Sequence, residues 1–118
     1  MAEAMEQYRQ GHYPAALHAL RRVPTDNLGA DTMLYYNGIF LLSQGDGRAA
    51  RPYLRRVLQQ PGSALSRKAR YHLAVAHWAA KQWPEARATF REVAVDSLNP
   101  YRRAAQKVLR NDVLREEE

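Results

Sequence analysis

The chain has 118 residues, of which 46% are hydrophobic and 25% are charged. This apolar share can build a packed core, so the composition excludes a disordered tail, and no apolar run reaches the about 18 residues of a membrane-spanning helix. There is no Cys, which excludes a disulfide scaffold, a thiol nucleophile and a cysteine zinc site. The 18 Lys and Arg outnumber the 12 Asp and Glu, which gives a net charge of +6.

Hydrophobic spacing and helix-ending residues predict seven helices and no strand. In chain order the predicted helices are Ala2–Gln10, Pro14–Arg22, Asp31–Gln44, Gly47–Gln60, Ser63–Lys81, Pro84–Val95 and Tyr101–Leu114. Gly45-Asp46-Gly47 is typical of a helix end followed by an N-terminal cap. Pro52 lies several residues inside its predicted helix, where we expect a kink or a later start.

The sequence repeats itself with spacings of 34 and 36 residues between the anchors Gly11, Gly45 and Lys81. The same residue types recur at fixed distances after the three anchors: Ala16, Ala50 and Ala86; Leu20, Leu54 and Phe90; Arg21, Arg55 and Arg91; Val23, Val57 and Val93. Small residues precede them at Ala4, Gly38 and Ala74. A period near 34 with small and large apolar residues four positions apart indicates stacked helical hairpins.

These repeats resemble tetratricopeptide repeats. The middle repeat matches that pattern at Leu34, Gly38, Ala50, Leu54 and Pro61, and the third at Leu73, Ala74, Ala86, Phe90 and Pro100. The sequence departs from it at Asn37, Leu41, His77 and Lys81. The resemblance implies an all-α solenoid in one domain, residues 1–118, with a truncated repeat at 1–29, repeats at 30–63 and 64–99, and a capping helix at 100–118.

The resemblance further implies a concave groove, lined by the first helix of each hairpin, that binds a peptide or helix of a protein partner. Helical spacing places large side chains on that face, and the predicted binding residues are Tyr8, Tyr35, Ile39, Leu42, Lys68, Tyr71, Val75 and Trp78. Rings bury much area at low entropy cost, so the groove suits an apolar segment. Acidic neighbours would be favoured by Arg67, Lys68 and Arg70.

Two readings compete with parts of this hypothesis. In the first, the predicted groove residues pack between neighbouring helices instead of facing a partner. Tyr36, Phe40 and Leu41 are better candidates for that packing role. Co-chaperones of this family bind acidic chaperone tails through Lys, Asn and Arg, but the matching positions here hold Met5, Tyr36, Lys68 and His72. We therefore do not expect binding of chaperone tails.

Two alternative functions remain open. A basic ridge on the convex side, predicted from Arg21, Arg22, Arg51, Arg55, Arg56, Arg87 and Arg91, would attract nucleic acid or an acidic partner. No aromatic residues are interleaved with it as a stacking platform, so nucleic acid is the less favoured reading. The last predicted helix ends in a polar stretch suited to covering the final apolar face, but the first helix, Ala2–Gln10, has no such cover. This predicts a longer parent protein, a partner that covers the first helix, or self-assembly into a scaffold or homo-oligomer.

Nothing in the sequence favours catalysis, a metal or a cofactor. The four histidines (His12, His18, His72 and His77) include no pair at i, i+4, the spacing of a helical zinc motif. We expect His77 to be a hydrogen-bonded packing residue and the chain to be no enzyme. Similar short arrays often form the soluble part of larger bacterial envelope or regulatory proteins, some membrane-anchored, so the location is left open between cytoplasm and periplasm.

Overall fold

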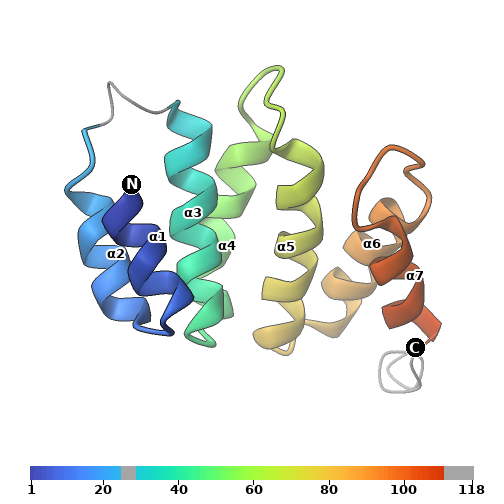
Figure 1. The fold of residues 1–118 in the computed structure, drawn as a ribbon. Helices are drawn as coiled ribbons and strands as arrows, with labels where there is room; N and C mark the ends of the chain where they lie inside the picture. Colours follow the sequence, from blue (N-terminus) through green and yellow to red (C-terminus); the bar gives the residue numbers. More distant parts are fainter. Residues whose placement is uncertain (25–28, 111–118) are drawn as a thin grey trace.

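The computed structural model describes residues 1–24 and 29–110. Within these ranges the chain forms seven helices and no strand: α1 (Ala2–Arg9), α2 (Tyr13–Arg21), α3 (Ala30–Ser43), α4 (Gly47–Leu58), α5 (Ser66–Ala79), α6 (Trp83–Ala94) and α7 (Arg102–Arg110). The helices alternate between two layers, with α1, α3, α5 and α7 in one and α2, α4 and α6 in the other (Figure 1). Each helix packs against the next, so the array is an all-α helical solenoid.

Each of the seven predicted helices is present, and most ends agree within two residues. The largest difference is at α5, which begins at Ser66 instead of Ser63. The Ser63 hydroxyl donates to Asp31 at the start of α3 (2.6 Å) and accepts from the Leu65 amide (3.1 Å). These bonds hold residues 63–65 in a turn, so the helix starts after them. The predicted end of the last helix, residues 111–114, lies outside the described residues.

Pro52 does not delay its helix, because α4 already begins at Gly47. Of the kink or later start expected at Pro52, the later start does not occur, and the predicted beginning at Gly47 is confirmed. Asp46 stabilises the early start, since its side chain accepts a hydrogen bond from the Ala49 amide (3.1 Å), as an N-terminal cap does. The exposed Pro52 ring removes one bond of the helical ladder.

The repeating positions form the core, which confirms the period. Ala16, Ala50 and Ala86 are completely buried, and Leu20, Leu54 and Phe90 are at most 1% exposed. They belong to three apolar clusters, one between α1, α2 and α3, one between α3, α4 and α5, and one between α5, α6 and α7. We call the layer of α1, α3, α5 and α7 the front layer and that of α2, α4 and α6 the back layer. Each helix of the back layer thus packs through apolar contacts against two helices of the front layer.

Two glycines allow helices to approach closely. A Cβ on Gly38 would lie 2.7 Å from the Leu54 side chain, between α3 and α4. A Cβ on Gly47 would lie 2.5 Å from the Ala76 carbonyl oxygen, where the start of α4 meets α5. Backbone cannot move aside as a side chain can, so the close contact between α4 and α5 requires glycine at position 47.

The turn inside each hairpin uses a left-handed residue at the same repeat position. Gly11 has φ of 80° and Gly45 has φ of 84°, while Lys81 adopts φ of 61° at the third turn. A residue with a Cβ is strained in this region. The third hairpin therefore keeps the backbone geometry of the other two although its sequence has lost the glycine.

Candidate partner-binding site

The eight residues predicted to bind a partner all lie on the front layer, but they fall into three groups. Tyr8, Tyr35 and Tyr71 contact rings of neighbouring elements, and Ile39 is half-buried against two of the core clusters. Leu42, Val75 and Trp78 come together around a hollow. Lys68 is exposed on α5.

Tyr8, Tyr35 and Tyr71 fill the seams between successive front-layer elements, and we call them the seam rings. Tyr8 of α1 stacks on Phe40 of α3 with 4.8 Å between ring centroids. The Tyr8 oxygen also accepts a bond from the Ser43 hydroxyl (3.4 Å). The ring contacts fix α1 against α3, a role that helical spacing alone does not distinguish from a groove position.

Tyr35 carries the next seam, between α3 and α5. It is only 7% exposed, and its ring meets His72 edge to face at 5.7 Å. The His72 Nδ1 donates to the Lys68 carbonyl at 2.9 Å, with the Tyr35 oxygen 3.3 Å away. Burial raises the pKa of Tyr35 and lowers the pKa of His72, so both groups are held in their neutral forms.

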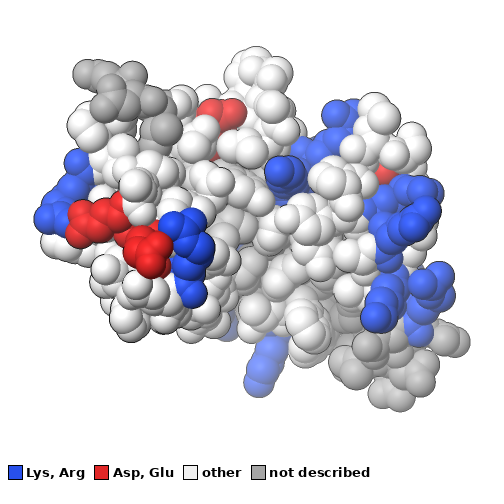
Figure 2. Space-filling model, viewed as in Figure 1, with Lys and Arg blue, Asp and Glu red and all other residues white. Residues whose placement is uncertain are grey.

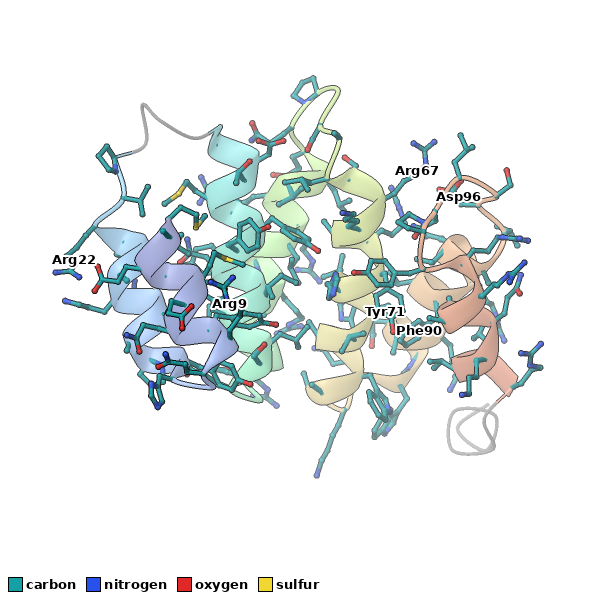
Figure 3. All side chains as sticks on the ribbon, viewed as in Figure 1. Arg9, Arg22, Arg67, Tyr71, Phe90 and Asp96 are labelled. Atoms are coloured by element: carbon teal, nitrogen blue, oxygen red, sulfur yellow. The ribbon has the colours of Figure 1, made fainter. Side chains whose placement is uncertain are left out.

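Tyr71 carries the third seam, between α5 and the chain leading into α7. It stacks on Tyr101 with centroids 4.4 Å apart and planes 6° from parallel, and it points toward Phe90 of α6 at 5.9 Å (Figure 3). Tyr101 is positioned by the buried Asn99, whose side chain accepts from the Tyr101 amide (2.9 Å) and donates to the Arg67 carbonyl (2.8 Å). Burial raises the pKa of Tyr71 as well.

The remaining apolar residues of the front face surround an open hollow of about 360 Å³. We call it the α3–α5 hollow, and its lining residues are Leu42, Val75, Trp78, Ala79, Lys81 and Trp83. Trp78 is 44% exposed and makes no ring contact within the described part of the chain, unlike the seam rings. Both tryptophans of the protein therefore line one site.

Sequence reasoning missed Trp83, Ala79 and Lys81 as parts of this hollow. A signal was present: Trp83 and Tyr13 hold the same repeat position, directly before Pro84 and Pro14. The middle repeat has Gly47 there, because Ala76 of α5 packs against that point. The third repeat instead has Trp83 there, and this ring lines the hollow together with Trp78.

The cations expected to favour acidic neighbours are mostly engaged within the protein. Arg67 pairs with Asp96 at 3.0 Å (Figure 3), and Arg70 pairs with Glu92 at 2.7 Å. Both bridges join α5 to α6 or to the loop after it, and both are largely solvent-exposed. Of the three expected cations, only Lys68 has no such partner among the residues that the structure describes.

The predicted basic ridge is not a continuous set of unpaired cations. Arg22 pairs with Glu3 of α1 at 3.1 Å. Arg51 is half-buried and donates to the Gln82 side-chain oxygen (2.6 Å), which also accepts from Nδ1 of the buried His77 (2.7 Å). His77 is thus a hydrogen-bonded packing residue, as predicted.

A family model for the tetratricopeptide repeat matches the chain twice, over residues 1–64 and 37–105. The chain belongs to the tetratricopeptide repeat family. No curated protein and no solved structure matches it significantly. Tetratricopeptide repeats generally mediate protein–protein interactions and are typically non-catalytic.

In residues 1–24 and 29–110, no three His, Asp or Glu side chains gather in a way that could hold a metal ion. No helix in the same ranges combines the length and apolar character required to cross a membrane.

Proposed function

We propose that this protein binds a segment of a partner protein across its front layer, with an apolar side chain of the partner inserted into the α3–α5 hollow. The observation that carries the proposal is the exposure of Trp78 beside Trp83. The seam rings are covered by rings of the protein itself, whereas Trp78 leaves 44% of its surface to solvent. An exposed large ring at an apolar depression is typical of an interaction site.

The size and lining of the hollow suit a side chain better than a cofactor. Its volume of about 360 Å³ is near the lower end of the range of about 300–1,000 Å³ for ligand pockets. Lys81 is the one charged residue of the lining, and four of the six lining residues are large and apolar: Leu42, Val75, Trp78 and Trp83. These residues offer apolar area and no set of convergent polar groups, which favours an apolar anchor of a peptide or helix.

The exposed surface of α1 gives less support to self-assembly. Its exposed residues are Ala2, Glu3, Glu6 and Arg9, and Glu6 pairs with Arg9 at 2.9 Å. The apolar side chains of this helix, such as Met5, pack inward on the first cluster. Stable interfaces between identical chains are usually apolar at their centre, and this surface is polar.

A random peptide library displayed on phage tests the proposal without knowledge of the partner. Peptides enriched on the immobilised protein are synthesised and titrated calorimetrically against wild type and Trp78→Ala. We expect Trp78→Ala to lose about 2 kcal/mol or more, roughly a 30-fold weaker affinity, as for a central interface ring.

The matched control is Leu98→Ala, which removes a side chain that is 70% exposed on the loop between α6 and α7. It should leave the affinity unchanged, and both variants should keep the wild-type circular dichroism spectrum. Failure to enrich any peptide, or equal binding to Trp78→Ala and wild type, would contradict the proposal.

A further inference from the structure

The terminal helix of the described chain carries a row of cations on its outer side. Arg103, Lys107 and Arg110 are exposed and lie at i, i+4 and i+7 on α7, which is one face of a helix. On the opposite side, Ala105 is buried in the third apolar cluster, with Val108 and Leu109 packed against it. We call the three cations the α7 stripe.

No carboxylate within the described residues neutralises the α7 stripe. The helix itself contains no Asp or Glu. Among the described residues, the acidic ones nearest in sequence are Glu92 and Asp96, and they already pair with Arg70 and Arg67 of α5. Within the described residues the stripe is thus a row of like charges, which raises the local positive potential and attracts an acidic group.

The α7 stripe and the α3–α5 hollow belong to the same layer of the array. Lys and Arg gather over α7 on the right of Figure 2, whereas the central surface over α3 and α5 carries few charged side chains. At the opposite end, over α1, Lys and Arg alternate with Asp and Glu (Figure 2). A segment that crosses this layer therefore meets an apolar centre and a basic end.

We propose that the bound partner segment is acidic, with Asp or Glu residues that contact the α7 stripe on the side of its apolar anchor facing α7. This inference rests on the proposed function and adds the charge of the partner and the direction in which it lies. Because complementary charges act mainly through association rate and selectivity, the stripe selects among apolar segments that the hollow alone would accept.

An acidic protein segment fits these features better than nucleic acid does. Binding of single-stranded nucleic acid needs exposed rings beside the cations, on which bases can stack. The ring next to the stripe, Tyr101, is already stacked on Tyr71. The α3–α5 hollow suits an apolar side chain, which a protein segment supplies and a phosphate backbone does not.

Two triple variants with the same change in net charge test the inference. One carries Arg103→Gln, Lys107→Gln and Arg110→Gln; the control carries Arg21→Gln, Arg55→Gln and Arg56→Gln, exposed positions on the back layer. The probes are the library-selected peptides. These peptides should be enriched in Asp and Glu on one side of an apolar anchor.

The stripe variant should bind the selected peptides about tenfold more weakly than wild type at about 50 mM salt, with a smaller difference at about 200 mM. The control variant should bind within about twofold of wild type. A library without acidic enrichment, or equal weakening in both variants, would overturn the inference. The inference would also be overturned if peptide binding were weakened by Trp78→Ala but not by the stripe variant. That outcome would leave the proposed function intact.

A short DNA duplex supplies the remaining arm of the test. We expect the duplex to leave peptide binding unaffected when it is added as a competitor at about 200 mM salt. Displacement of the peptide by the duplex, together with duplex binding that is lost in the stripe variant, would assign the stripe to nucleic acid and overturn the inference.

Discussion

Tyr71 and Trp78 lie seven residues apart on the same face of α5, yet one ring packs between elements and the other remains exposed. Tyr71 is covered by Tyr101 and Phe90 and joins α5 to its neighbours. Trp78 meets no ring in the described chain and stays 44% exposed beside the α3–α5 hollow. The comparison teaches that a position on a helix face is not yet a function, because the neighbouring elements decide whether that face is a seam or a surface.

Replacement of each ring by alanine should separate these two roles, and the replacement at Tyr71 should have the largest effect on stability. Tyr71→Ala removes a stacked, partly buried ring and should lower the free energy of unfolding by about 2–3 kcal/mol. Trp78→Ala should lower it by about 1 kcal/mol or less, since half-exposed side chains contribute less. Chemical denaturation with a shared slope measures both values. Equal losses would show that Trp78 also belongs to the core.

A smaller effect is expected at the left-handed turn beside the hollow. Lys81→Gly should stabilise the protein by about 1 kcal/mol, because glycine adopts φ of 61° without the strain that a Cβ causes. Gly45→Ala at the equivalent turn should destabilise it by a similar amount. Thermal melting of the two variants checks the opposite signs, and two changes of the same sign would show that the turns are not equivalent.

The seam at Tyr35 predicts a dependence of stability on pH. Burial lowers the pKa of His72 in the folded protein, so below about pH 6.5 the unfolded chain takes up a proton that the fold resists. The free energy of unfolding should therefore fall as the pH drops from 7 toward 5. Denaturation of His72→Asn should show a flatter pH profile than denaturation of the wild type. Identical profiles for the two proteins would contradict a half-buried His72 that the fold keeps neutral.

The smallest effect is expected for the ion pairs that join α5 to α6 and to the loop after it. Arg67→Gln and Arg70→Gln should each cost about 0.2–1 kcal/mol, and less at high salt, because both pairs are exposed. Peptide binding should not change in either variant, since these cations are engaged within the protein. Weaker peptide binding in either variant would show that the pair opens to meet the partner.

The helices and the core could be predicted from the sequence because they depend on local patterns. Ala50 and Leu54 recur with the repeat and are both completely buried, and Asp46 caps the helix whose start it predicted. Family and fold follow from the same pattern. Helical spacing also placed Trp78 on the front layer, where the structure has it.

The division of that face into seams and a hollow could not be predicted in this way. It depends on contacts between distant segments, such as Tyr101 on Tyr71 and Asp96 on Arg67. Spacing within one helix says which side a residue faces, but not what the next repeat sets opposite it. For the same reason the cations at Arg67 and Arg70 looked available to a partner, while the α7 stripe went unnoticed.

Intrinsic tryptophan fluorescence tests the central claim most directly, because both tryptophans of the chain line the α3–α5 hollow. Titration with a selected peptide that lacks tryptophan should shift the emission to shorter wavelength as the peptide covers Trp78. The midpoint of that shift should equal the calorimetric dissociation constant. Saturable peptide binding with unchanged emission would place the partner elsewhere on the array and contradict the account.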